Sequence, residues 1–496
     1  MSIIGFIKAN LSLTKKQSIL LLLIPLVLSG YTHLYNPVGF PDIFFDEGVY
    51  MRRAMNVLEG NGPQESYFYD HPYFGQLFLS GAMFLAGFPN SLQPEPEASS
   101  IASLYMIPRI FMGFLAIIDT FLIYKIAKKQ YGFTTGIVAS TLFAVMPITW
   151  MLRMILLDSL LLPFLLLSVL FALNSKDSKN KTLIILLSGI SLGLAIFTKV
   201  PIVTMIPLVG FFVFSTNKSW KHVGLWFLPV ILIPLIWPAY SISIDQFDLW
   251  MKDVLWQSGR SGGGILHLSD QFLLIDPLLF VLGIGSFVYA GIRKDKFVLL
   301  WLIPFLVYFS FIGYTQYFHW IPILPIFCIA TAVLLKKLSV KFKEKLKTIP
   351  YVFVLAVLVF GFTSTTMLIT TDLSSAQFEA IAFVLQNISN EDDLTILSSP
   401  VYSWILSDVF NVNGALPDYS VVLFEPITTK KILVISDIHF LVDFERGKQI
   451  QEVYEKTKTV KQFEGNVANY DIFQYPYTSM KITHEASNVE IRTNFS

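Results

Sequence analysis

The chain has 496 residues, of which 54% are hydrophobic and only 14% are charged, and its mean hydropathy is +0.60. A soluble globular chain carries about 25% charged residues, so this composition excludes a soluble protein and indicates a polytopic membrane protein. The 36 Lys and Arg residues against 35 Asp and Glu leave a net charge of +1, so no charge excess points to nucleic acid as a partner. The single cysteine, Cys328, excludes an internal disulfide and a cysteine-clustered metal or iron–sulfur site.

Apolar runs long enough to form transmembrane helices recur along the chain. The hydrocarbon core of a bilayer requires about 20 mostly apolar residues per helix. Eleven runs meet this requirement, at residues 17–34, 101–126, 133–151, 155–173, 182–199, 201–216, 221–240, 272–292, 297–313, 319–336 and 350–370. We therefore predict an α-helical polytopic membrane protein with about eleven transmembrane helices.

A twelfth apolar run, residues 73–88, decides the topology. If this run does not cross the membrane, twenty Lys and Arg residues from six loops and ends gather on one face. If it crosses, all but the first three of them lie on the other face. Because basic loop residues stay on the cytoplasmic side, the first arrangement is favoured. The sequence thus predicts a multi-pass protein of the cell membrane with a cytoplasmic N-terminus and an extracytoplasmic C-terminus.

This topology leaves two large loops and a tail outside the membrane. The loops are residues 35–100 and 241–271, and the tail is 372–496. The tail has 9 Lys and Arg against 17 Asp and Glu, and its short apolar runs (LTIL, YSVVLF, KILVIS, YDIFQY) alternate with helical patterns such as AQFEAIAFVLQNI. We predict a transmembrane domain at residues 1–371 and a small soluble α/β domain at residues 372–496.

The first outside loop carries an acidic pair followed by a second polar group. Asp46 and Glu47 precede an amphipathic helical pattern, and Asp70 and His71 follow about 25 residues later. A short amphipathic helix here would lie in the membrane interface. Asp46 is either the N-cap of that helix, part of a polar active site at the bilayer surface, or both.

Further polar groups lie at the outer ends of the predicted spans. Arg109 begins the second span, Arg153 and Asp158 begin the fourth, and Lys199 follows the fifth. Ionisable groups at membrane depth usually face a bundle interior or a polar cavity. The alternatives are a structural ion pair between Arg153 and Asp158 and an interfacial anchor at Lys199.

The second loop and a late span add four candidates. Arg260 and His267 flank the Gly-rich segment SGGG, and an arginine suits a phosphate ligand. Tyr317 and His319 lie at the outer mouth of the tenth span in YTQYFHWIPILP. The alternatives are a mobile surface loop with an incidental arginine and an ordinary aromatic belt.

Taken together, these residues resemble the GT-C class of membrane glycosyltransferases, and most closely the protein O-mannosyltransferases and aminoarabinose transferases. The resemblance rests on FDEGVY, DHPYFGQ, RMILLDS and YFHWIPILP, in this order, over about the first 340 residues. Two features differ from the family pattern. Tyr73 stands where a second proline is usual, and the sugar-binding repeats of a late loop are missing.

The resemblance implies an inverting transferase that moves a hexose or pentose, such as mannose, from a polyprenyl- or dolichyl-phosphate donor. Acceptors would be hydroxyl groups of a protein, lipid or glycan. Asp46 is the predicted general base, with Glu47 and Asp158 orienting the sugar or the acceptor. The predicted substrate-binding residues are His71, Arg109, Arg153, Lys199, Arg260, His267, Tyr317 and His319.

A divalent cation such as Mg²⁺ or Mn²⁺ is compatible with this chemistry but is not required by the motifs. If a cation binds, its predicted ligands are Asp46, Glu47 and Asp158. The alternative function is a polytopic transporter or flippase of a lipid-linked or small solute. Transporters place their charges near the midplane of the bilayer, whereas the polar groups here cluster at one face, which favours an enzyme.

Overall fold

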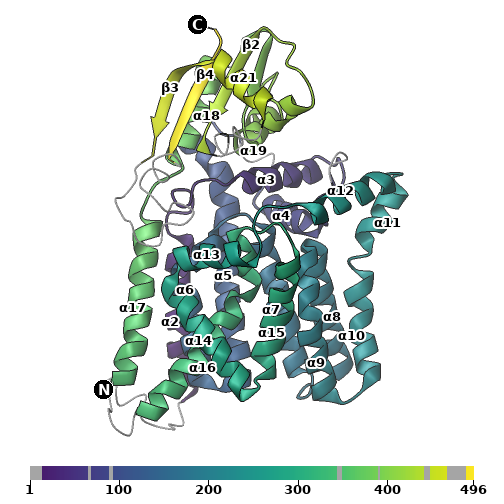
Figure 1. Cartoon of the computed structure of the whole chain (residues 1–496), viewed down its shortest axis with the longest axis vertical. Helices are drawn as coiled ribbons and strands as arrows, with labels where there is room; N and C mark the ends of the chain where they lie inside the picture. Colours follow the sequence, from purple (N-terminus) through teal and green to yellow (C-terminus); the bar gives the residue numbers. More distant parts are fainter. Residues whose placement is uncertain are drawn as a thin grey trace.

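A computed structural model describes residues 14–64, 69–88, 93–342, 349–388, 391–438, 440, 447–465 and 487–495. A helical bundle forms the lower part of the molecule, and a small sheet with flanking helices lies above it (Figure 1). The helices of the bundle are α2 (Lys15–Leu34), α5 (Ala98–Tyr131), α6 (Phe133–Val145), η1 (Pro147–Arg153), α7 (Leu157–Asn174), α8 (Lys181–Thr198), η2 (Val200–Met205), α9 (Ile206–Asn217), α10 (Trp220–Leu232), α11 (Ile236–Ser243), α14 (Pro277–Arg293), α15 (Lys296–Phe311), η3 (Tyr317–Ile323), α16 (Leu324–Phe342) and α17 (Ile349–Ile369).

Within the described residues, eight helical segments are long and apolar enough to cross a membrane. A ninth is added if α6 and η1, which meet at a bend of 70°, form one span. The remaining two predicted spans are the apolar helices α14 and α15, which have 17 and 16 residues. The predicted polytopic helical class is confirmed, and the eleven predicted runs are all helical, although three are shorter or more bent than predicted.

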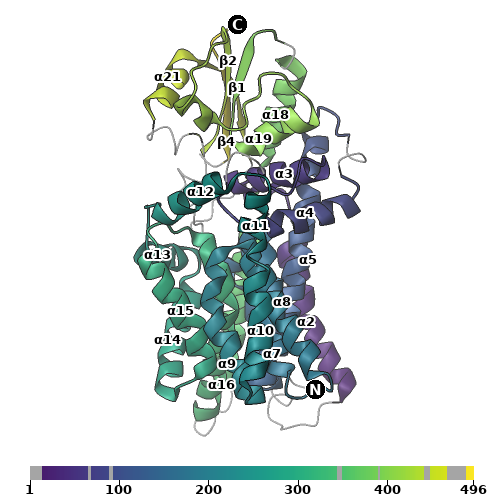
Figure 2. The same cartoon turned by 90° about the vertical axis from the view of Figure 1, so that its right-hand side faces the viewer.

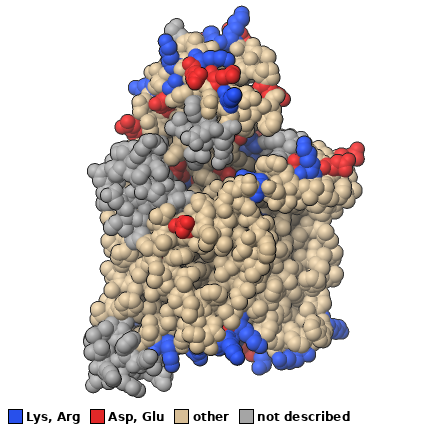
Figure 3. All heavy atoms as spheres, viewed as in Figure 1, with Lys and Arg blue, Asp and Glu red and all other residues tan. Residues whose placement is uncertain are grey.

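The basic loop residues lie together at one end of the bundle. Lys129, at the end of α5, pairs with Asp177 of the α7–α8 loop, and the Tyr131 hydroxyl donates to Asp295 before α15 at 2.9 Å. Figure 3 shows Lys and Arg along the lower edge and a broad band above them that is nearly free of charge. This charge-poor band separates the basic end from the sheet domain, as a hydrocarbon layer requires.

Four short helices form a layer between the bundle and the sheet domain (Figures 1 and 2). They are α3 (Phe45–Leu58), α4 (Phe74–Leu85), α12 (Phe247–Gly259) and α13 (Ile265–Ile275). With 12 residues, α4 is about 18 Å long, which is too short for a hydrocarbon core of about 30 Å. This length favours the prediction that the run at 73–88 does not cross, which stays a prediction.

The C-terminal part contains α18 (Ser375–Asn387), α19 (Pro400–Trp404), η4 (Ile405–Val409), η5 (Tyr419–Leu423), α21 (Lys448–Lys456) and a four-stranded sheet. The strands, β1 (Leu394–Leu397), β2 (Lys431–Ser436), β3 (Lys458–Glu464) and β4 (Asn488–Thr493), lie in the order β1-β2-β4-β3. β1 and β2 pair in parallel, with Leu394 opposite Lys431, and the other pairs are antiparallel.

The predicted strands LTIL and KILVIS are β1 and β2, and the predicted helix AQFEAIAFVLQNI is α18. The prediction for YSVVLF was wrong, because its first five residues form the 3-10 helix η5. Its aromatic residue Tyr419 packs against Phe440 and Phe45. The run YDIFQY lies outside the described residues. β3 and β4 were not predicted. β3 is polar and largely exposed, whereas β4 alternates buried Val489 and Ile491 with polar residues, a signal that was missed.

The helix α3 lies between the bundle and the sheet domain. Gln377 of α18 exchanges two hydrogen bonds with the backbone of Ile43, just before α3, at 2.8 and 3.1 Å. The Trp404 indole of α19 donates to the Tyr105 hydroxyl of α5 at 2.7 Å. Every residue of α3 itself is buried or half-buried, so this helix packs against protein; the prediction that it lies at the membrane interface stays a prediction.

Gly48 allows α19 to approach α3 closely. A Cβ at this position would lie 2.3 Å from the carbonyl carbon of Pro400, and the backbone there cannot yield cheaply. We expect Gly48→Ala to loosen the sheet domain, to lower stability by about 1–3 kcal/mol and to speed proteolysis within residues 372–496.

The matched control is Gly81→Ala in α4, where a Cβ meets nothing within 4 Å. Thermal unfolding and limited proteolysis of the purified variants measure the difference. Equal behaviour of the two variants would contradict the close docking of α19 on α3.

Candidate active site

The site is built around the first turn of α3. The Phe44 amide donates to the Glu47 carboxylate at 3.0 Å, and α3 begins at Phe45. Asp46 is therefore the second residue of the helix and not its N-cap, which corrects that alternative. A carboxylate in the first turn lies in the positive potential of the helix N-terminus.

Asp46 is half-buried, and within the described residues no hydrogen bond to its carboxylate is found. Burial raises the pKa of Asp46 to about 6, and the charge of Asp70 adds to this rise. Lys199, Arg260 and Arg53 act in the opposite direction. This carboxylate is thus accessible, ringed by cations and close to the pKa that suits a general base near neutral pH.

Asp70 and His71 lie beside Asp46 on the loop before α4. Arg53 of α3 forms an ion pair with Asp70 at 2.8 Å. Burial alone would raise the pKa of Asp70, but Arg53 and His71 outweigh it and hold this pKa below its ordinary value. Burial lowers the pKa of His71 to about 4, so the imidazole is neutral at neutral pH. Asp253 of α12 fixes the loop by accepting from the Tyr69 amide at 2.8 Å.

The ends of α7 and α8 contribute a buried ion pair to the same site. The Lys199 ammonium lies 2.5 Å from the Asp158 carboxylate, and both side chains are at most 5% exposed. Lys199 also lies 5.0 Å from the centre of the Phe318 ring. The predicted alternatives for these residues are therefore corrected: Lys199 is no surface anchor, and Asp158 pairs with Lys199 rather than with Arg153.

Arg260 and His319 add two further groups to the site. The Arg260 guanidinium stacks on Tyr314, 3.6 Å from the ring centre, and donates to Gln257 at 3.2 Å. His319 Nδ1 accepts from the Gln316 amide at 3.0 Å, which assigns the proton of a neutral imidazole to Nε2. The charges of Lys199, His71 and Arg260 all act on His319, so these groups share one space.

Glu47, which follows Asp46 directly, has a different environment. Arg109 of α5 donates to both of its oxygens, at 2.6 and 2.9 Å, and the Ile155 amide donates at 2.9 Å. Both charged side chains are fully buried. Both oxygens of Glu47 thus accept hydrogen bonds from protein groups, and the Glu47–Arg109 pair holds the start of α3 to the bundle. The prediction that Glu47 and Arg109 contact substrate finds no support in this geometry.

Three other predicted residues lie apart from this cluster. Arg153 is fully buried, and its Nη2 donates to the carbonyls of Tyr35 and Asn36. Tyr317 packs against Trp150, with ring centres 5.8 Å apart. His267 is exposed on α13, and its Nε2 lies 2.8 Å from the amide nitrogen of Gln271. Nε and Nη1 of Arg153 have no hydrogen-bond partner within the described residues, so the substrate-binding roles of these residues stay predictions.

Sequence reasoning missed three residues of the site: Tyr50, Arg53 and Tyr314. Tyr50 and Arg53 follow Asp46 by four and seven positions, so a helix places all three on one face. Burial raises the pKa of Tyr50 well above its ordinary value, with Asp46 as the next largest cause. The helical spacing was a signal that could have found both residues. Tyr314 is recognised only by its contact with Arg260.

The three carboxylates predicted as metal ligands do not converge. Glu47 forms an ion pair with Arg109, and Asp158 forms one with Lys199. Across the described part of the chain, no group of three or more His, Cys, Asp or Glu residues could hold a metal ion. The donor set therefore does not fit the predicted cation, and no step below uses one.

Comparisons with known proteins give a family match and a common fold. Residues 21–249 match the family model described as dolichyl-phosphate-mannose-protein mannosyltransferase. This segment contains Asp46, His71, Asp158 and Lys199. No curated protein matches the chain by sequence.

The solved structures show the fold. ArnT from Cupriavidus metallidurans in the apo state is 11% identical, with a TM-score of 0.56 over 96% of this chain and 97% of that chain. The same protein bound to undecaprenyl phosphate is 12% identical, with a TM-score of 0.54 over 100% of this chain and 99% of that chain. A third structure is the archaeal oligosaccharyltransferase AglB from Archaeoglobus fulgidus in complex with an inhibitory peptide and a dolichol-phosphate. It is 12% identical, with a TM-score of 0.55 over 92% of this chain and 74% of that chain.

At such identities the structural likeness establishes the fold, and the family match over residues 21–249 supplies the class of enzyme. The resemblance inferred from FDEGVY and the later motifs is thereby confirmed, and the transporter alternative is not supported. The chain is a multi-pass membrane glycosyltransferase with the GT-C fold, and its residues 21–249 match the mannosyltransferase family model.

Proposed function

We propose that the protein transfers a sugar from a polyprenyl- or dolichyl-phosphate donor to an acceptor hydroxyl, with inversion at the anomeric carbon. The observation that carries this proposal is Asp46, an accessible carboxylate with a raised pKa that is ringed by cations. The solved relatives crystallised with undecaprenyl phosphate and dolichol-phosphate support a lipid-phosphate donor.

In the proposed step, Asp46 removes the proton of the acceptor hydroxyl while its oxygen attacks the anomeric carbon. The bond from this carbon to the phosphate oxygen breaks, and the lipid phosphate leaves with the electron pair. Cations placed where this negative charge develops lower the barrier. We assign Arg260 and the Nε2–H of His319 to binding of the phosphate. We assign the Asp158–Lys199 pair to positioning of the sugar.

We also propose that the site lies on the extracytoplasmic side of the membrane, with the basic end of the bundle in the cytoplasm. The positive-inside rule supports this orientation. In this arrangement residues 1–371 form the transmembrane domain, and residues 372–496 form an outer domain that supports α3 from above. The sugar and the acceptor are best identified by incubating the purified chain with a panel of lipid-phosphate sugars and tracing the labelled product.

The assignment of Arg260 predicts weaker donor binding in Arg260→Ala. The substitution removes charge-assisted hydrogen bonds that are worth about 1.5–3 kcal/mol each, so donor affinity should fall by at least about tenfold. Lys252→Ala is the matched control, because Lys252 is an exposed cation on α12, the helix that ends directly before Arg260. Equal donor affinity of the two variants in a titration with polyprenyl phosphate would remove Arg260 from the site.

The raised pKa of Asp46 predicts an acidic limb in the pH profile. A general base acts only when deprotonated, so kcat/KM should fall tenfold for each pH unit below about 6. His71, whose pKa is about 4, remains neutral over the same range and adds no limb above pH 5. The acidic limb should therefore persist in the His71→Gln variant. If the limb disappears in this variant, His71 and not Asp46 is the group that titrates.

A further inference from the structure

The basic end of the bundle contains a pocket that the proposed transfer reaction does not use. Its volume is about 570 Å³, and it lies where the α7–α8 loop and the first turn of α8 meet the start of α10. Three basic residues line it, Lys179, Lys181 and His222, together with polar and leucine side chains of the first turns of α8. The first turn of α8 lies at the lower end of the bundle, whereas α3, which carries Asp46, lies at its upper end (Figure 2).

The charge around this pocket is strongly positive. The α7–α8 loop and the α9–α10 loop border the pocket, and a hydrogen bond of 2.9 Å from Asn217 to Ser175 joins them. They present five exposed lysines: Lys176, Lys179, Lys181, Lys218 and Lys221. Asp177 is the single acid in these loops, and Lys129 already pairs with it. An anion in the pocket would therefore meet a positive field without competing carboxylates.

Two polar features of the pocket wall suit an anion as well. Asn180, the N-cap of the 18-residue helix α8, makes no side-chain hydrogen bond to the helix, so the first amides of α8 retain their capacity to bind a negative group. His222, at the start of α10, also lines the pocket, and its imidazole can donate a hydrogen bond to an anion. These groups come from two separate helices.

The apolar surroundings distinguish a lipid headgroup from a free anion. Trp220, at the start of α10, is 75% exposed, and Leu183 of α8 is 51% exposed. A tryptophan beside the charged rim of a bundle belongs at the membrane–water interface. A ligand in this pocket thus has its acyl chains beside apolar helix surface and its phosphate beside the lysines.

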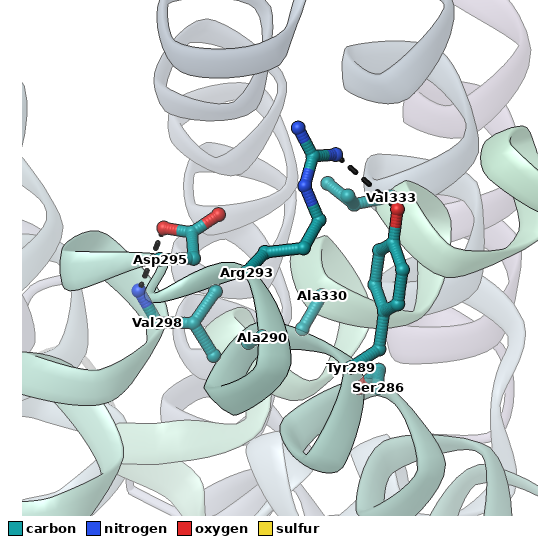
Figure 4. A pocket seen from close by; sticks show the side chains of 8 residues that line it. All are labelled: Ser286, Tyr289, Ala290, Arg293, Asp295, Val298, Ala330 and Val333. Atoms are coloured by element: carbon teal, nitrogen blue, oxygen red, sulfur yellow. Dashed lines mark hydrogen bonds between the residues drawn. The ribbon is translucent and has the colours of Figure 1, made fainter.

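We propose that the pocket binds the headgroup of an anionic phospholipid. Basic pockets between transmembrane helices have this function in general, with each nearby Lys contributing about 1 kcal/mol. Another cavity at this end has only about 10 Å³, which is room for one water molecule. In that cavity Arg293 donates to the Tyr289 hydroxyl and Asp295 caps α15 (Figure 4). The polar groups that line this smaller cavity are thus already hydrogen-bonded within the protein.

The test measures binding of short-chain phosphatidylglycerol to the purified full-length chain, with phosphatidylcholine and inorganic phosphate as parallel probes. We expect saturable binding of phosphatidylglycerol alone. Lys179→Ala/Lys181→Ala should weaken it about 30-fold. Lys294→Ala/Lys296→Ala removes the same charge from the same end but outside the pocket, and should leave the affinity within about twofold.

A third variant tests the pocket itself without any change of charge. Thr182→Trp places an indole in the cavity that Thr182 lines and should abolish saturable binding. The proposal is overturned if phosphatidylcholine binds equally well, if inorganic phosphate competes fully, or if the Lys294/Lys296 control loses as much affinity as the pocket variant. Since Asp46 is intact in all variants, these outcomes are independent of the transfer reaction.

Discussion

Asp46→Asn should reduce the rate of sugar transfer by about 100- to 10,000-fold, the range that a general base contributes. Asparagine has nearly the same size but cannot accept the proton of the acceptor. The carboxylate makes no hydrogen bond within the described residues that the substitution would break, so thermal stability should hardly change. Donor affinity should also persist, because Arg260 and His319 are unaltered. The measurement is single-turnover transfer with saturating donor.

Asp46→Glu serves as the companion variant, since it keeps the base but moves it by one methylene. It should recover part of the rate and keep the acidic limb of the pH profile. Transfer by Asp46→Asn at a rate near that of the unaltered chain would exclude Asp46 as the base. Asp158 would then be the next carboxylate to test, although its ion pair with Lys199 makes it a poorer base.

Glu47→Gln should damage stability rather than chemistry. It leaves the Arg109 guanidinium fully buried without its counter-charge, and the loss of one partner from a buried pair costs about 3–5 kcal/mol. The Ile155 amide loses a charged acceptor as well. We expect a large fall in the unfolding temperature in detergent, with less protein recovered from membranes.

The neighbouring variant Asp46→Asn is the control, because it makes the same chemical change one position earlier. The double variant Glu47→Gln/Arg109→Gln should lose less stability than the sum of the two single variants, since the unpaired charge is gone. If Glu47→Gln is as stable as Asp46→Asn but inactive, Glu47 acts on substrate after all, as the sequence predicted.

Asp46 and Glu47 show what sequence reasoning can and cannot separate. Both stand in the first turn of a predicted amphipathic helix, and nothing in the sequence distinguishes their environments. The helix turns adjacent residues by about 100°, so one carboxylate faces the cation-ringed site and the other faces Arg109 of α5. Only the packing of α3 on α5 decides which carboxylate is free.

The sequence by itself determined the helical membrane class and the α/β nature of the tail. These follow from hydropathy, segment length and charge, which are local properties. The tertiary structure decided that Lys199 pairs with Asp158, 41 positions away, and that Arg260 stacks on Tyr314. It also decided that α3 lies buried beneath α19. Such contacts join segments that the bilayer and the sheet domain bring together, and pairing across so large a separation leaves no periodic signal in the chain.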